Sequence, residues 1–235
     1  KIFGTNSKKH PGVALMKKKR NFFIGGKTYL LNTAIPKEFY FRFPKINRHY
    51  LSSKNNSNAA FSTRNICHSG HALIQQYILN KVKILYVVII ENSNNKYDPK
   101  ILFETYEMLI RKMNLKNKMK IISILMPTFF AGPKEAFLQA IIMQNLGFSN
   151  FIVGRDHAGV KDFYGKYASQ KIFKKFRHLD IKILKTKEPR ICTNCNNVIF
   201  YKGVNQCKTC SSRNKIVGIN GKYVKQKIKE GDFSK

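Results

Sequence analysis

Short apolar runs alternate with helix-length segments between residues 58 and 184, and this pattern limits the possible folds more than any other feature of the chain. The longest run, Ile84 to Ile90, is apolar at every position. A continuous apolar run is typical of a strand that is buried on both faces of a parallel sheet. Strands joined by single helices form right-handed βαβ units. We therefore expect an α/β fold with a Rossmann-like parallel sheet.

The pattern also predicts where the elements lie. The expected strands are Asn58 to Phe61, Val82 to Ile90, Lys120 to Leu125, Phe151 to Val153 and Ile181 to Leu184. The expected helices are Ser69 to Leu79, Pro99 to Met113, Pro133 to Leu146 and, near the end, Tyr223 to Lys229. We expect the first helix to turn Ala72, Leu73 and Tyr77 toward the core, and the second to carry Leu102, Tyr106 and Leu109 on one face.

The first 48 residues have a different character. Phe22 to Leu31 is typical of two strands around a Gly-Gly turn, which predicts the end of a separate β-rich unit. The chain starts at Lys1 rather than Met, so we expect it to be a piece of a longer protein.

The chain is strongly basic, with 44 Lys and Arg against 12 Asp and Glu and a net charge of +32. One interpretation is a polyanionic partner such as nucleic acid. The other is compositional drift, because Lys, Asn and Ile are all abundant, Trp is absent and the lysines are spread along the whole chain. Either way the surface attracts small anions. The sequence has no run of eighteen apolar residues, so it predicts no membrane-spanning helix.

Four of the five cysteines form two closely spaced pairs, Cys192-x2-Cys195 and Cys207-x2-Cys210. This spacing predicts a tetrahedral zinc site in a small zinc-ribbon-like region; redox-active or unpaired thiols are the alternative. Zinc-bound thiolates indicate a reducing compartment, and we expect a cytoplasmic protein, with an organelle left open. The remaining cysteine, Cys67, is interpreted as a packed residue.

Two turns place basic side chains beside glycine, directly after strand-like runs. One is Thr63 to His71, and the other is Gly154 to Gly159. At neighbouring strand ends they would form one pocket for phosphate or sulfate groups. His68 and His71 share one face of a helix in its first turn, where free backbone N–H groups also point outward. Two imidazole donors at such a position can stabilise charge on a transferring phosphoryl group.

The residues leave other interpretations open. His68 and His71 could be two surface histidines, and Arg155 could belong to a charged surface. His157 could be a packed core residue, and Asp156 is interpreted as a carboxylate that orders Arg155.

The His-x-Gly-His pattern of residues 68–71 resembles the signature of the nucleotidylyltransferase superfamily. Longer segments resemble the ATP sulfurylase (sulfate adenylyltransferase) family: Phe61 to His71, Ala131 to Ala136, Phe151 to Gly165, His10 to Ala14 and the cysteine quartet. The resemblance covers essentially the whole chain in the family's order. It implies three parts: residues 1–48 as the end of an N-terminal PUA-like β domain, 49–187 as the catalytic α/β nucleotidylyltransferase domain, and 188–235 as a zinc knuckle with a C-terminal helix.

The resemblance implies transfer of AMP from ATP to sulfate, which gives adenosine 5′-phosphosulfate and pyrophosphate, or the reverse reaction. Mg²⁺ would accompany ATP and Zn²⁺ would be structural. The family commonly assembles, so we expect a homo-oligomer, and we expect neither nucleic acid nor a membrane as partner. The implied catalytic residues are Thr63, Arg64, Asn65, His68 and His71. The implied nucleotide-binding residues are Ser62, Arg64, Gly154, Arg155, Asp156 and His157, and sulfate would meet Arg64 and the backbone of Ala158.

The chain departs from the family pattern at several positions. Ser62 stands where the family has Gln, Ile66 where it has Pro, Phe129 where it has Arg, and Gln139 where it has His. Ile219 to Lys225 replaces a Ser-Gly-Thr-x-Val-Arg run that closes on the ATP phosphates. Three hypotheses follow: a working or weakened ATP sulfurylase, a catalytically inactive nucleotide-binding relative, or a basic zinc-containing nucleic-acid-binding protein.

Overall fold

The computed structural model of the 235-residue chain describes residues 2–18, 25–27, 29, 57–91, 97–176, 178–201, 203, 206–213, 215–219 and 221–231. Its centre is a parallel sheet of five strands, β1 (Asn58–Thr63), β2 (Ile84–Glu91), β3 (Met119–Leu125), β4 (Asn150–Val153) and β5 (Lys182–Lys185), in the order β3-β2-β1-β4-β5. The Rossmann-like fold class is confirmed.

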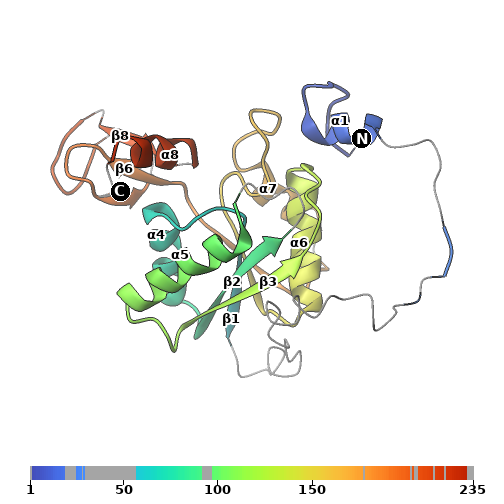
Figure 1. Ribbon diagram of the computed structural model, residues 1–235, viewed down its shortest axis with the longest axis horizontal. Coiled ribbons are helices and arrows are strands. Elements are labelled where there is room, and N and C mark those ends of the chain that lie inside the picture. The colour runs from blue at the N-terminus through green and yellow to red at the C-terminus, as the bar shows by residue number, and fades with distance from the viewer. Residues whose placement is uncertain are drawn as a thin grey trace.

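Helices cover both faces of this sheet (Figure 1). On one face lie α4 (Ser69–Leu79) and α5 (Pro99–Lys112), and on the other α6 (Pro133–Asn145). Alternate residues of β2 belong to two separate cores: Val87 and Ile89 pack toward α4 and α5, and Val88 and Ile90 toward α6. Because both faces are buried, β2 is apolar throughout instead of alternating with polar residues.

The strand order reverses between β1 and β4, since the chain adds β2 and β3 on one side of β1 and then returns to the other. The two strands pair only through Ala59–Ala60 with Asn150–Phe151. Beyond these pairs, toward the carboxyl ends, a crevice opens. Ligands of open α/β sheets bind at such a reversal point. The two turns singled out in the sequence follow directly from β1 and β4.

The boundaries of the predicted strands and helices agree with the structure to within two residues. The buried face of one helix differs from the prediction. In α4 the buried residues are Gly70, Ile74, Gln75 and Ile78, whereas Ala72 and Leu73 are half-buried and Tyr77 is 39% exposed. The prediction that Ala72, Leu73 and Tyr77 face the core was therefore wrong. Tyr77 instead packs edge-on against Phe200, with ring centroids 5.2 Å apart. The contact partner is 123 positions away in sequence, so helical periodicity could not reveal it. In α5, Leu102 and Tyr106 are fully buried as predicted.

A second, antiparallel sheet follows β5. Its strands are β6 (Pro189–Cys192), β7 (Val198–Phe200) and β8 (Ile216–Gly218), in the order β7-β6-β8. We call this part, with the four cysteines, the cysteine module. It packs beside α4 and is followed by α8 (Gly221–Lys229), so the helix predicted at Tyr223 to Lys229 is present (Figure 1). Short helices α7 (Ala168–Lys171) and η2 (Ile172–Lys174) connect β4 to β5.

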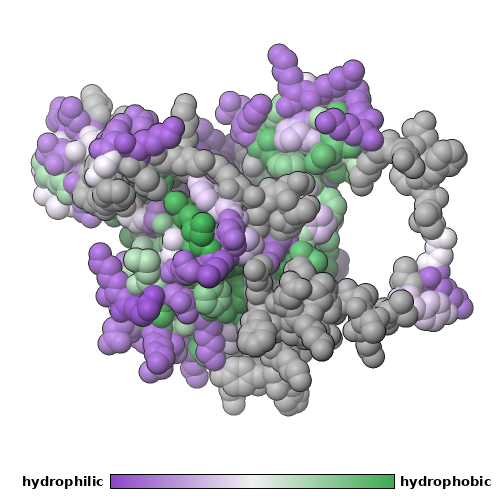
Figure 2. Space-filling model, in the orientation of Figure 1, coloured by the Kyte–Doolittle hydropathy of each residue, from purple (hydrophilic) through white to green (hydrophobic). Residues whose placement is uncertain are grey.

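Near the N-terminus, α1 (Pro11–Lys18) docks through a buried histidine. His10 Nδ1 accepts from the backbone N–H of Gly12 at 3.1 Å, and its Nε2 lies 3.1 Å from the hydroxyl of Tyr164. The predicted hairpin at Phe22 to Leu31 lies mostly outside the described residues. Hydrophilic side chains are spread over α1, α5 and the cysteine module rather than gathered on one element (Figure 2). None of the helices in the described part of the chain is long and apolar enough to cross a membrane.

Candidate functional site

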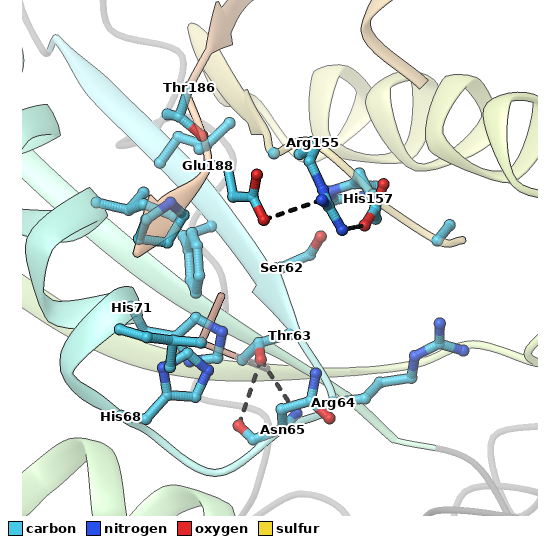
Figure 3. A pocket seen from close by; sticks show the side chains of 18 of the residues that line it. Ser62, Thr63, Arg64, Asn65, His68, His71, Arg155, His157, Thr186 and Glu188 are labelled. Atoms are coloured by element: carbon cyan, nitrogen blue, oxygen red, sulfur yellow. Dashed lines mark hydrogen bonds and ion pairs between the residues drawn. The ribbon is translucent and has the colours of Figure 1, made fainter. Parts of the chain in front are cut away.

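A cavity of about 320 Å³ opens at the carboxyl edge of the sheet, between β1 and β4. It brings together every nucleotide-, sulfate- and phosphate-site residue expected from the sequence: Ser62, Thr63, Arg64, Asn65, His68, His71, Gly154, Arg155, Asp156, His157 and Ala158. In Figure 3 the two histidines approach from α4, whereas Arg155 lies beyond Ser62 on the other side. Segments about 90 positions apart in sequence thus share one site.

The two histidines of α4 lie against each other. His68 directly precedes the helix in an extended conformation, and its ring stacks on that of His71 with centroids 3.8 Å apart and planes 24° apart. Gly70 makes this approach possible: a Cβ there would lie 3.1 Å from the His68 ring and 3.2 Å from Pro189 of the cysteine module. His68 Nδ1 is buried and has no hydrogen-bond partner within the described residues.

Both histidines are neutral at pH 7. Burial lowers the pKa of His68 to about 4. The pKa of His71 is well below its ordinary value, first because of burial and then because of the neighbouring His68, although the backbone of Ile66 acts in the opposite direction. Neutral imidazoles still donate one hydrogen bond each.

A chain of polar contacts fixes His71 from behind. Its Nδ1 lies 3.0 Å from the hydroxyl oxygen of Tyr106 on α5. That hydroxyl lies 3.5 Å from Thr63 Oγ1, which in turn accepts from the backbone N–H of Asn65 at 3.1 Å. Thr63 therefore orders the turn after β1 and is coupled to the histidine pair through Tyr106.

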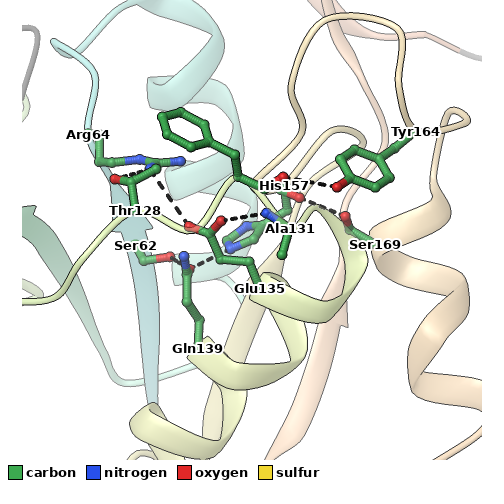
Figure 4. Close-up of polar contacts among 10 residues, drawn as sticks. Ser62, Arg64, Thr128, Ala131, Glu135, Gln139, His157, Tyr164 and Ser169 are labelled. Atoms are coloured by element: carbon green, nitrogen blue, oxygen red, sulfur yellow. Dashed lines mark hydrogen bonds and ion pairs between the residues drawn. The ribbon is translucent and has the colours of Figure 1, made fainter. Parts of the chain in front are cut away.

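Arg64 is held from the opposite side by the loop between β3 and α6 and by the first turn of α6. Its Nη1 donates to Thr128 Oγ1 at 2.6 Å and lies 3.7 Å from Glu135 Oε1. Burial raises the pKa of the Glu135 carboxyl, against the opposing charge of Arg64 and the backbone N–H of Ala131. The guanidinium lines the cavity while these groups fix its direction (Figure 4).

Arg155 is paired with two carboxylates. It contacts Asp156, as expected, and its Nη1 also donates to Glu188 Oε1 at 2.9 Å. Burial acts to lower the pKa of Arg155, but the hydrogen bond and charge of Asp156, with the charge of Glu188, raise it. The other oxygen of Glu188 accepts from Arg190 of the cysteine module at 3.1 Å. Glu188 thus joins the cavity to the module.

The turn after β4 has a constrained backbone. Ala158 adopts a left-handed conformation with φ 55°, which is uncommon for a residue with a side chain and typical of functional sites. The N–H of Gly159 donates to the carbonyl of Asp156 at 2.9 Å and closes the turn. The carbonyl of His157 accepts from Ser169 Oγ at 2.6 Å. These contacts fix the backbone at the position expected to meet sulfate.

The profile of the ATP-sulfurylase family matches residues 39–233, which is most of the chain. The chain belongs to the ATP-sulfurylase family. Proteins named sulfate adenylyltransferase are similar to it: one from Hyperthermus butylicus is 34% identical over 86% of the chain and 53% of its own length. Another, from Halothermothrix orenii, is 31% identical over 98% of the chain and 61% of its own length. The chain therefore spans a little over half the length of these curated relatives.

A solved structure shares the fold. It is described as the hexameric APS kinase from Thiobacillus denitrificans, and it matches 82% of the chain and 36% of its own chain with a TM-score of 0.55 and 12% identity. At this identity the match shows the fold alone.

Two of the departures from the ATP-sulfurylase pattern contact each other. Ser62 Oγ donates to Gln139 Oε1 at 2.9 Å, and His157 Nε2 lies 2.7 Å from the same oxygen (Figure 4). Phe129 is 42% exposed and does not line the cavity. Ile219 does line it, whereas Asn220 lies outside the described residues.

The four cysteines of the module are positioned to hold a metal ion. Their sulfur atoms all lie within 4.8 Å of one another, with Cys192 and Cys210 3.7 Å apart and Cys195 and Cys207 3.6 Å apart. Tetrahedral zinc with Zn–S bonds of about 2.3 Å places its sulfur ligands about 3.8 Å apart, so the cluster fits zinc. Cys67 is half-buried and burial raises the pKa of its thiol to about 12, as suits a packed residue.

Several residues around the cavity were not assigned a role from the sequence: Tyr106, Thr128, Glu135, Thr186 and Glu188. Thr186 lines the cavity, is 3% exposed, and its Oγ1 has no hydrogen-bond partner among the residues that the structure describes. Thr186 and Glu188 follow β5, which lies next to β4 at the same edge of the sheet. Their position after a predicted strand was a signal that could have marked them.

Proposed function

We propose that this chain carries the catalytic site of a sulfate adenylyltransferase. The observation that carries the proposal is the shared cavity, in which Arg64 and the histidine pair face the turn from Gly154 to Ala158 at the reversal point of the sheet. The names of the family's relatives support this substrate class.

In the proposed reaction an oxygen of sulfate attacks the α-phosphorus of ATP, and the bond to pyrophosphate breaks. Sulfate is a poor nucleophile, so positioning and charge stabilisation dominate over acid–base chemistry. Arg64 offers a planar guanidinium to sulfate and phosphate oxygens. His68 and His71 donate to the phosphates as neutral imidazoles, and the backbone at Ala158 meets sulfate. Ser62, Thr63 and Asn65 shape the β1 end of the site, and Gly154, Arg155, Asp156 and His157 bind the nucleotide.

The ions have separate roles in this proposal. Mg²⁺ bound to ATP would neutralise part of the phosphate charge. Zn²⁺ would be structural and held by the four cysteines, which bring two CxxC segments together in a module too small to have a large core of its own. The module lines part of the cavity through Pro189, Gly218 and Ile219, so zinc also supports one wall of the nucleotide site.

We propose the three-part division at residues 48 and 187 as the organisation of the chain. It is supported by the two sheets, which lie within 58–185 and 189–218. A homo-oligomer and a reducing, cytoplasmic setting belong to the same proposal, and the free cysteines are compatible with such a setting.

A catalytically inactive nucleotide-binding relative is the second candidate. It is favoured by Phe129 at the family's arginine position, and by the pairing of both cavity arginines with carboxylates: Arg64 with Glu135, and Arg155 with Asp156 and Glu188. Each of these features reduces the positive charge offered to a transition state. The even distribution of basic residues gives no stripe that would favour nucleic acid.

ATP formation from adenosine 5′-phosphosulfate and pyrophosphate tests the proposal directly. We expect turnover that depends on both substrates and falls strongly in Arg64→Ala. Nucleotide binding without turnover would support the inactive relative, and binding of neither substrate would reject both candidates.

A further inference from the structure

Gln139 is a buried glutamine at the wall of the cavity. It lies on α6, is 2% exposed and lines the cavity opposite the end of β1. Its carboxamide oxygen accepts a hydrogen bond from the hydroxyl of Ser62 at 2.9 Å and lies 2.7 Å from His157 Nε2. One helix residue therefore joins the end of β1 to the turn after β4.

Both of these contacts are made by the oxygen of the Gln139 amide group and neither by its nitrogen. A carboxamide oxygen has two lone pairs, and here both are occupied if His157 carries its proton on Nε2. The amide nitrogen, in contrast, makes no hydrogen bond to another residue of the described part of the chain. The nitrogen belongs to a side chain that lines the cavity, so its two N–H groups are left for a ligand.

We propose that the Gln139 amide nitrogen is a hydrogen-bond donor to an anionic substrate oxygen, in place of the glutamine that the family carries at position 62. This inference rests on the proposed function. The family places a long amide on β1 and histidine on α6, whereas this chain has a short hydroxyl on β1 and a long amide on α6. Residues 62 and 139 contact each other. The amide donor therefore borders the same part of the cavity, but it comes from α6 instead of β1.

The oxygen that receives this donor belongs to sulfate or to the α-phosphate of ATP. These two sources share their chemistry and are distinguished by the Michaelis constant that changes. A lost hydrogen bond to a charged group weakens binding by roughly 10- to 100-fold. We expect Gln139→Leu to raise the KM for sulfate by that factor if sulfate is the partner, and the KM for ATP if it is the phosphate.

Gln139→Glu provides a second variant with nearly the same shape. It keeps acceptors for Ser62 and His157 but removes the N–H groups and adds a negative charge, so it should lower kcat/KM at least as much as Gln139→Leu. The matched control is Gln75→Leu: Gln75 is also a buried helix glutamine, 1% exposed, and both its amide atoms lack partners among the described residues. The control should retain wild-type kinetics.

The exchange also predicts rescue. Ser62→Gln alone would crowd Gln139, and Gln139→His alone would leave the donor missing. The double variant restores the family's pair, so its kcat/KM should exceed that of either single variant. The proposal would be overturned if Gln139→Leu and Gln139→Glu had the same kinetics as the wild type. It would also be overturned if the losses of the two single variants added up in the double variant.

A spectroscopic readout separates this inference from the proposed function. Nitrogen NMR of the His157 ring in the ligand-free protein should show the proton on Nε2, as the oxygen of Gln139 requires. A proton on Nδ1 would mean that the amide is turned the other way and would contradict the proposal. Absence of turnover in the wild type would reject the proposed function, and it would leave the NMR result to decide the orientation of Gln139.

Discussion

Nδ1 of His71 lies 3.0 Å from the hydroxyl oxygen of Tyr106, so helix α5, which contributes no residue to the cavity wall, fixes a histidine that does. Tyr106 is fully buried and burial raises the pKa of its phenol well above the ordinary value, with Cys67 adding to the shift. Its hydroxyl is therefore neutral, and it links His71 to Thr63 rather than titrating near neutral pH.

Replacing Tyr106 with Phe removes this hydroxyl while retaining the ring in the core. We expect a loss of about 1–3 kcal/mol in the free energy of unfolding, because a buried imidazole nitrogen loses a partner. Turnover should fall with it, since His71 is no longer fixed. Urea denaturation and the reverse reaction measure the two effects. A variant with normal turnover would show that Tyr106 only fills the core.

Arg64 offers a test of guanidinium geometry. Arg64→Ala should reduce turnover by roughly 100- to 1,000-fold, the loss typical of a donor to developing negative charge. Arg64→Lys should recover little of it, because an ammonium group cannot contact Thr128 and an anion as a planar fork can. Arg111→Ala, at an exposed position near the end of α5, serves as the control for net charge. Near-normal rates in both Arg64 variants would reject its place in the site.

Three cavity histidines predict a stability that depends on pH. Burial lowers the pKa of both His68 and His157 from 6.5 to about 4, with Arg64 adding to the shift of His157, and that of His71 lies well below 6.5. The unfolded chain therefore binds more protons than the folded protein below pH 6.5. Stability should be full above this pH and fall toward pH 4, by at most about 1.4 kcal/mol per pH unit for each histidine.

Urea denaturation at pH 7.5 and 5.5 measures this dependence. Glu135 acts in the opposite direction, because burial raises the pKa of its carboxyl and the folded protein then holds its proton more tightly. His157→Gln should make the dependence on pH shallower. An unchanged slope in that variant would show that His157 does not titrate on unfolding.

If the four cysteines hold zinc as proposed, its removal should affect both the stability of the protein and the proposed nucleotide site. A chelator, or Cys192→Ser, is expected to lower the melting temperature, because the folded module supplies the ligand geometry. The cavity wall includes Pro189, Gly218 and Ile219, so nucleotide affinity should fall as well. Calorimetry with and without chelator measures the first effect, and titration with a non-hydrolysable ATP analogue the second. Cys67→Ser is the control for loss of a thiol outside the cluster; the same melting temperature with and without chelator would argue against structural zinc.

The sequence by itself determined the βαβ alternation, the positions of the central strands and helices, and the eleven predicted site residues that line the cavity. Local chemistry suffices for these, because apolar runs have strand or helix length and glycine-rich basic turns follow them. It also determined the cysteine quartet, since two CxxC pairs restrict the geometry of their thiolates.

Only the tertiary structure decided how the site is supported. It placed Tyr106 behind His71, Glu188 between Arg155 and Arg190, and Gln139 between the end of β1 and the turn after β4. It also turned Tyr77 toward the cysteine module rather than the core. Each of these contacts joins residues at least 18 positions apart, apart from the short link between Glu188 and Arg190. Such contacts depend on which elements become neighbours in the sheet. Local sequence periodicity cannot predict this, because it does not specify the order of the strands.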